Sequence, residues 1–165
     1  MITKETIKNS LNAKWHLHNL RTYGVVGLIY GMVMLFIAIF AALMHGDFIL
    51  AISITGGIFL FFALAISPFV IYEAHRYRSL FKSIDNYEPC EAMLDRPSTS
   101  YWARGAIYYT VTFKTSYGES VTTDTRAMWS SAPLAQNQLS DYNNKTVTLA
   151  YDKKNDRLVV IGLKK

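Results

Sequence analysis

Charged side chains are almost absent from the middle of this sequence. Between Thr22 and Tyr72, Asp47 is the one lysine, arginine, aspartate or glutamate. Apolar runs of about 18 residues or more with few charges are typical of membrane-spanning helices, and residues 23–44 and 48–72 both form such runs. The sequence therefore predicts two spans. Their lack of ionisable side chains argues against a proton relay, an ion pathway or a charged substrate site within the membrane.

Cysteine and histidine are also scarce. The single cysteine, Cys90, excludes an internal disulfide, and we expect it to be a small buried strand residue. Residues 88–165 contain no histidine, so that part of the chain lacks Ser-His-Asp and Cys-His pairs and a zinc site built from His and Cys. It also has no glycine-rich phosphate loop. We therefore expect no catalysis, no metal and no cofactor.

A short polar break divides the apolar stretch at His45, Gly46 and Asp47. Gly46 can adopt the left-handed conformation that ends a helix, and Asp47 can cap the next helix. One helix over all these residues would be roughly 75 Å long, whereas the hydrocarbon layer is roughly 30 Å thick. We therefore predict a transmembrane helical hairpin at 23–72, with spans 23–44 and 48–72. A re-entrant pair that never crosses is the alternative.

Lysine and arginine flank the predicted hairpin but are missing from its turn. Because positive residues favour the cytoplasmic side, we predict a two-pass protein of the cell inner (plasma) membrane with both termini cytoplasmic. The residues predicted to lie at the membrane interface are Trp15, Arg21, Arg76, Arg78 and Lys82.

Small residues recur along both spans and would let the helix backbones approach closely in lipid. In a hairpin centred on Gly46, residues whose numbers add up to about 92 lie at the same depth, which pairs Gly31 with Phe61. This surface can serve packing within one chain or formation of a homo-oligomer, and both uses stay open. The predicted packing residues are Gly27, Gly31, Ala38, Gly56 and Gly57.

The segments flanking the hairpin are predicted to be helical. Residues 1–22 form an amphipathic helix that Thr3 can cap, with Ile7, Leu11 and Trp15 four residues apart. This helix can lie on the inner leaflet or pack on the C-terminal domain, and both interpretations stay open. Residues 73–87 are predicted to form a juxtamembrane helix and linker.

From residue 88 onward the apolar pattern alternates, as in strands. We predict five strands, with a short helix after Pro133, between the third strand and the fourth. This order matches a small OB-like barrel, with an SH3-like barrel as the rival. The chain is thus predicted to be an α+β membrane protein with a cytoplasmic β-barrel domain at 88–165. The expected core residues are Val111, Phe113, Val121, Val147, Leu149, Val159 and Ile161.

The segment NKTVTLAYDKKNDRLVVIG, residues 144–162, resembles the closing hairpin of a group of uncharacterised small bacterial membrane proteins. That group closes with G-x-x-V-x-V-x-Y-[DN]-P. Asn144 stands for the glycine and Lys153 for the proline, whereas the matching residues are Val147, Leu149, Tyr151 and Asp152. The resemblance implies two transmembrane helices joined to a compact β-domain. The layout is also similar to NfeD-like membrane-anchored OB domains, and neither group implies a catalytic residue.

The loop RPSTSYWARG, residues 96–105, is the most distinctive candidate surface. Tyr101, Trp102 and Arg104 are residue types that anchor protein interfaces, and Tyr108 follows closely. The alternative is that Trp102 folds back on the barrel or enters the membrane interface.

A function in binding is the hypothesis that remains. From residue 86 onward there are ten Lys or Arg and eight Asp or Glu, a balance that argues against nucleic-acid binding, which needs a basic groove. We therefore predict a protein-binding or scaffolding module with no catalysis of its own, whose partners are the lipid bilayer and another protein. Membrane-tethered nucleic-acid binding of the OB type and an accessory subunit of a membrane enzyme or transporter are the alternatives.

Overall fold

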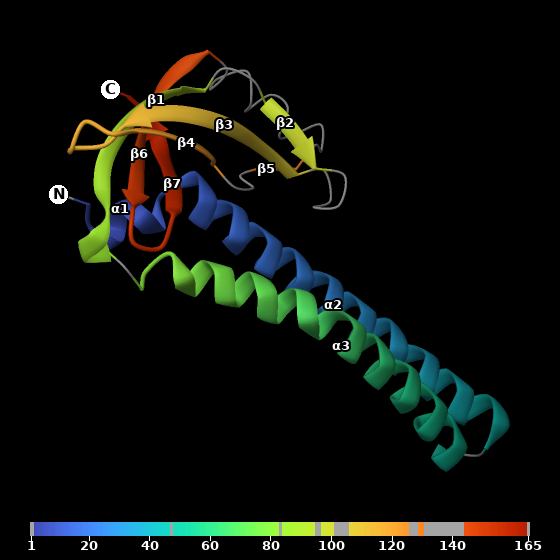
Figure 1. Cartoon of the computed structure of the whole chain (residues 1–165). Helices are drawn as coiled ribbons and strands as arrows, with labels where there is room; N and C mark the ends of the chain where they lie inside the picture. The colour runs from blue at the N-terminus through green and yellow to red at the C-terminus, as the bar shows by residue number, and fades with distance from the viewer. Residues whose placement is uncertain are drawn as a thin grey trace. The chain divides into compact units, whose positions relative to one another are not determined.

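The chain folds as an α+β protein with two long helices and a C-terminal sheet region (Figure 1). This computed structural model describes residues 2–46, 48–82, 84–94, 97–100, 106–125, 129–130 and 144–164. The chain divides into two compact units. Unit 2 is Leu17–Arg76, and unit 1 combines Met1–His16 with Tyr77–Lys165. The first residues of the chain therefore belong to the same unit as the strands.

The two long helices are α2 (Leu11–His45) and α3 (Phe48–Ser79). They run side by side in opposite directions in Figure 1. Both are long and apolar enough to cross a membrane, and only 6% and 11% of the residues in their most apolar windows are buried. Such exposure separates them from the core helices of a soluble protein, which bury their apolar side chains. The helices are consistent with a two-pass membrane protein.

The turn between α2 and α3 contains Gly46 in the left-handed conformation, with φ of 69°. Its backbone N–H donates to the carbonyl of Ala42 at 3.1 Å. Gly46 therefore ends α2 as the sequence predicts, because a glycine has no Cβ to oppose a positive φ. Asp47, the predicted cap of the second helix, lies outside the described residues.

The hairpin register also agrees with the sequence. Residues whose numbers add up to 92 meet across the two helices within unit 2. The ring centroids of Tyr30 and Phe62 lie 4.4 Å apart. The ring centroids of Tyr23 and Phe69 lie 6.3 Å apart. Asn19 Nδ2 donates a hydrogen bond to Glu73 Oε1 at 2.9 Å.

The N-terminal segment differs from the continuous helix predicted over 1–22. A short helix, α1 (Lys4–Lys8), is capped by Thr3, whose Oγ1 accepts from the Thr6 N–H as predicted. The chain then breaks, and α2 starts at Leu11. The Ser10 hydroxyl accepts from the backbone N–H of Ala13 at 3.2 Å. A serine that satisfies a free N–H in the first turn starts a new helix, which explains the break.

Three antiparallel strands form one sheet of unit 1, in the order β1-β6-β7. A short 3-10 helix, η1 (Ile84–Asn86), leads into β1 (Glu88–Leu94). The other two strands are β6 (Lys145–Asp152) and β7 (Arg157–Leu163), whose pairing shifts register between Thr148 and Leu149.

A second sheet is built around β3 (Ala106–Lys114). The first half of β3 pairs with β2 (Pro97–Ser100) and with β5 (Trp129–Ser130). Its second half pairs with β4 (Ser120–Asp124). In the described part of the chain these strands do not hydrogen-bond to β1, β6 or β7, so the two sheets remain separate.

The sheet β1-β6-β7 is the central layer of unit 1 because both of its faces are buried. On one face, Leu149 and Val160 share a core with Val111 and Phe113 of β3. On the other face, Ala150 and Val159 join a cluster with N-terminal and α3-proximal residues, which are Ile7, Ala13, Leu80 and Tyr87. Of the predicted core, Val111, Phe113, Val147, Leu149 and Val159 are buried, while Val121 and Ile161 are partly buried against it.

The predicted five-stranded barrel is therefore corrected in part. The described residues form seven strands in two sheets that share a core, and no closed barrel is found among them. The physical reason is that β3 divides its pairing among three short neighbours, while β1 pairs with β6 alone. The short helix predicted after Pro133 lies outside the described residues.

Candidate functional site

Asn12 is a buried polar residue that links the N-terminal segment to both sheets of unit 1. It is 2% exposed. Its Oδ1 accepts from the Val160 N–H at 2.8 Å, and its Nδ2 donates to the carbonyl of Thr125 at 3.0 Å. Thr125 in turn accepts from the Tyr109 N–H through Oγ1 at 2.9 Å. One side chain thus satisfies a backbone group of β7 and one directly after β4.

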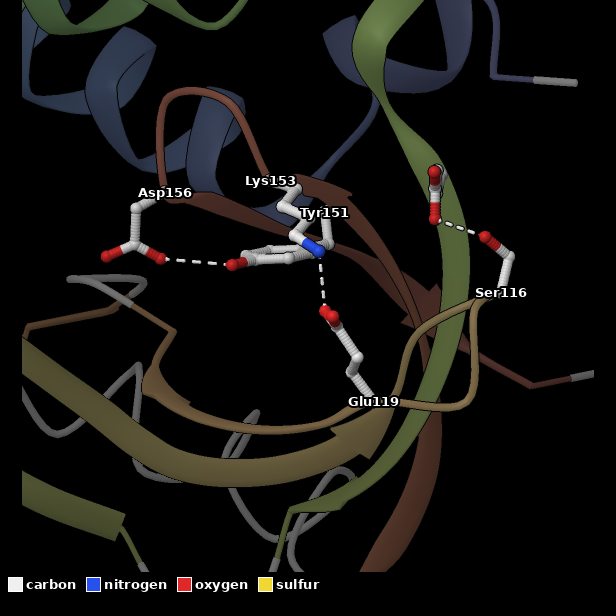
Figure 2. Close-up of polar contacts among 6 residues, drawn as sticks. Ser116, Glu119, Tyr151, Lys153 and Asp156 are labelled. Atoms are coloured by element: carbon white, nitrogen blue, oxygen red, sulfur yellow. Dashed lines mark hydrogen bonds and ion pairs between the residues drawn. The ribbon is translucent and has the colours of Figure 1, made fainter.

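Figure 2 shows a polar cluster where the β3–β4 and β6–β7 turns approach each other. Lys153 Nζ lies 2.5 Å from Glu119 Oε2, and the Tyr151 hydroxyl donates to Asp156 Oδ1 at 3.3 Å. Beside them, the Ser116 hydroxyl donates to the Glu88 carboxylate at 2.6 Å. The ion pair of Lys153 and Glu119 therefore joins the two turns, and the hydrogen bond from Ser116 joins the β3–β4 turn to β1.

The protonation of this cluster does not suit proton transfer. Burial, followed by the charge of Asp156, raises the pKa of the Tyr151 hydroxyl. The hydrogen bond to Glu119 and the charge of Glu119 raise the pKa of the Lys153 ammonium. A general base needs a pKa near the working pH, and both shifts move away from neutrality. We interpret the cluster as a connection between two hairpins.

Cys90 is buried on β1, as the sequence predicts. Burial, and then the charge of Glu88, raises the pKa of its thiol. The thiolate is the reactive form of cysteine, so this environment makes Cys90 an inert core residue. In the described part of the chain, no group of three or more His, Cys, Asp or Glu residues is placed to hold a metal ion.

A basic groove of about 730 Å³ lies on unit 1. Residues of α1 form one side, among them Lys4 and Lys8, and the end of α3 and the residues after it form the other, with Tyr77, Arg78 and Phe81. The rings of Tyr77 and Phe81 pack edge to face, with centroids 5.2 Å apart. The sequence predicts Arg78 at the membrane interface but does not reveal this groove, because the groove requires the N-terminal segment to pack on unit 1.

The predicted partner surface is described in only one of its residues. Tyr108 is half-buried on β3, where it is paired with Ser98 of β2. Tyr101, Trp102 and Arg104 lie outside the described residues. The recognition role of this loop therefore stays a prediction.

The predicted interface residues occupy different surroundings. Trp15 is half-buried, whereas Arg21 is exposed. Arg76 donates from Nε to the Tyr72 hydroxyl at 3.1 Å, and its guanidinium lies 5.2 Å from the centre of the Tyr72 ring. Arg78 and Lys82 are exposed, and Arg78 lines the basic groove.

Within the helical hairpin, aromatic residues fill the contact more than small ones do. A Cβ added at Gly31 would lie 3.4 Å from Phe59 Cε2, whereas Phe61, which the sequence places at the same depth, is 69% exposed. A Cβ at Gly27, Gly56 or Gly57 would meet no atom within 4 Å. Gly27 instead lines an apolar groove of about 290 Å³ with Tyr30 and Phe62, while Ala38 is half-buried.

Asp152 stabilises the turn of the closing hairpin, which joins β6 to β7. The Asp152 carboxylate is fully buried and accepts from the backbone N–H of Lys154 and Asn155 and from Asn155 Nδ2. These contacts form an Asx turn, in which an aspartate side chain bonds to the backbone two and three residues further on. No protein-family model matches the chain, and no curated protein and no solved structure matches it.

Proposed function

We propose that this chain is a two-pass protein of the inner (plasma) membrane that presents its β-domain in the cytoplasm as a protein-binding or scaffolding module. The observation that carries the proposal is the composition of unit 1, which contains the residues before α2 and the residues after α3. Segments that share one core lie on the same side of a membrane. A hairpin of two crossings meets that condition, whereas one crossing does not.

The charge pattern supports the cytoplasmic side. Lysines and arginines occur on both flanks of the hairpin and are absent from its turn, as expected when the flanks remain in the cytoplasm. A fluorescent protein fused after Lys165 is expected to fluoresce, and alkaline phosphatase fused there is expected to be inactive. Active phosphatase with dark fluorescent protein would contradict this orientation.

The binding role is supported by the character of unit 1. Its buried polar groups, Asn12 and Asp152, hold backbone together, and the Tyr151 and Lys153 pKa values are shifted away from neutrality. These features stabilise the fold of the domain, and the loop of residues 96–105 is the proposed surface for a partner. We place the contact at Tyr101, Trp102, Arg104 and Tyr108 because aromatic and arginine side chains supply most interface energy.

The test uses the full chain in membranes with a mild chemical crosslinker. The expected result is one protein, identified by mass spectrometry, that the parent chain and Tyr117→Ala capture equally and that Trp102→Ala captures several-fold less. Tyr117 is a matched control because it is 75% exposed on another turn. Equal capture by all three chains, or no captured protein, would contradict the proposal. A captured membrane enzyme or transporter would assign the chain as its accessory subunit.

A further inference from the structure

Three cationic side chains converge on the basic groove of unit 1. Lys4 and Lys8 are four residues apart on α1, a spacing that places them on one face of the helix. Arg78 contributes from the end of α3, and all three are exposed. Within the described part of the chain none of them forms an ion pair. Glu5 is the one carboxylate among the lining residues, so the lining carries a net charge of +2.

The groove is built on a packed base. Tyr77 and Phe81 line it and also pack against the cluster that contains Ile7 and Leu80. Ile7 is fully buried and lies on α1, between Lys4 and Lys8. Its burial fixes α1 to the sheet and holds both lysines across from Arg78. The groove thus has an aromatic surface with positive charge on both sides.

We propose that this groove binds the headgroup phosphate of an anionic phospholipid of the inner leaflet. The charge of Lys4, Lys8 and Arg78 is complementary to such a phosphate, and clusters of lysine and arginine that flank a membrane span in the sequence attract anionic headgroups. The rings of Tyr77 and Phe81 offer an apolar surface to the glycerol and the first acyl methylenes.

The position in the sequence supports a lipid as the source of the phosphate. Tyr77 and Arg78 follow Tyr72, where the apolar run ends, by five and six residues, or roughly 8 Å of helix. The headgroup layer on each side of the hydrocarbon core is roughly 5–8 Å thick. This inference rests on the proposed membrane location and is independent of the proposed protein partner.

The experiment measures lipid binding to the full chain purified in a neutral detergent. Native mass spectrometry follows the titration with dioleoylphosphatidylglycerol and, in parallel, with dioleoylphosphatidylcholine. The anionic lipid is expected to bind more tightly than the zwitterionic one. In Lys4→Gln/Lys8→Gln/Arg78→Gln its binding should weaken by about fivefold for each charge removed, the factor that corresponds to about 1 kcal/mol.

Two further variants separate the groove from net charge. Lys114→Gln/Lys145→Gln/Lys154→Gln removes the same charge from exposed positions outside the groove lining, and its binding should match that of the parent chain. Lys4→Arg/Lys8→Arg/Arg78→Lys keeps the charge and should also bind like the parent. Equal weakening in the two glutamine triples would overturn the groove, because the lipid would then respond to overall charge.

Soluble glycerophosphoglycerol distinguishes a lipid from a free phosphate compound, because it carries the same phosphodiester without acyl chains. It should bind far more weakly than the lipid. Equal affinity would overturn a lipid occupant. Phase separation in Triton X-114 tests the membrane location separately from lipid binding at the groove. A chain that enters the detergent phase but shows no preference for the anionic lipid would overturn only the lipid-binding proposal.

Discussion

At the scale of the residue, Asn12 connects two backbone segments of unit 1. A buried amide that bonds to two backbone groups replaces the water that each of them would otherwise need. Val160 lies on an edge strand of the sheet β1-β6-β7, and Asn12 Oδ1 accepts from its N–H. Asn12 therefore satisfies a group on the open edge of the sheet, where unpaired N–H groups invite pairing with other chains.

We expect Asn12→Ala to lower the free energy of unfolding by about 2–4 kcal/mol, because it leaves the Val160 N–H and the Thr125 carbonyl without this partner. Thermal unfolding of the full chain in detergent, followed by circular dichroism, measures the change. Hydrogen exchange at the Val160 amide should accelerate as well. Asn9→Ala is the control, since Asn9 is exposed on the same segment, and it should change stability by less than about 0.5 kcal/mol. Equal stability of the two variants would refute the role of Asn12.

The sequence could predict some residue roles and not others. Cys90, Val111, Val147 and Leu149 are recognisable because apolar residues alternate along a strand. Asn12 is not, because a lone amide in a helical pattern has the same appearance on a surface as in a core. Its role depends on Val160, which is 148 residues away, and pairings at that distance leave no local pattern.

At the scale of the element, the helical hairpin was the most predictable part. Its lengths, its turn at Gly46 and its depth register follow from apolar runs and helix geometry alone. The packing surface was less predictable. Small residues suggested close contact at Gly27, Gly56 and Gly57, whereas the structure packs Tyr30 with Phe62 and Gly31 with Phe59. Aromatic rings fill these contacts, and a pattern of small residues does not reveal which rings meet.

We expect a cysteine pair at Tyr30→Cys and Phe62→Cys, in a Cys90→Ala background, to be bridged within one chain by a short bis-maleimide. The wild-type rings meet with centroids 4.4 Å apart, so we expect both thiols to lie within reach of one reagent molecule. Mass spectrometry of the reacted chain distinguishes one bridging reagent from two separate adducts.

A pair at the same depth provides the control for this crosslink. Leu28 and Leu64 also have numbers that add up to 92, but they are 62% and 63% exposed and so lie on outer surfaces of the hairpin. Leu28→Cys with Leu64→Cys should give separate adducts and no bridge within the chain. Bridging at equal yield in both pairs would contradict the helix orientation, and bridged dimers of the control pair would identify a homo-oligomer.

The sheets show a different limit of prediction. The run LAYD, residues 149–152, is buried throughout, as is the run LVV, residues 158–160. Continuous apolar runs are typical of strands covered on both faces. The alternation along residues 106–114 predicts one buried face, and the order of five strands with a short helix favours a closed barrel. The second covering layer comes from the N-terminal segment, which the strand pattern cannot specify.

At the scale of the whole molecule, unit 1 is assembled from two ends of the chain that the hairpin separates. We expect residues 77–165 alone to be less stable than a permuted chain in which a Gly/Ser linker joins residue 165 to residues 1–16. Truncation removes the fully buried Ile7, and loss of such a side chain costs about 2–5 kcal/mol. Urea unfolding of both soluble chains measures the difference.

Point variants of the permuted chain test whether the added segment packs as described. Ile7→Ala should remove much of the gained stability, whereas Lys8→Ala, at an exposed position, should not. If residues 77–165 alone unfold at the same urea concentration as the permuted chain, that result would show that the N-terminal segment is not needed for stability. It would also remove the structural basis of the shared side of the membrane.

The contact between Asn12 and Val160 imposes an order on biogenesis. Asn12 lies at the start of the first long helix, and the ribosome makes it 148 residues before Val160, which follows both helices. At roughly 5–20 residues per second, the early segment waits roughly 7–30 s for its strand. During that interval Ile7 and Leu11 lack the strand residues that bury them in the folded chain. The apolar side chains of this early segment therefore stay uncovered until translation reaches β7.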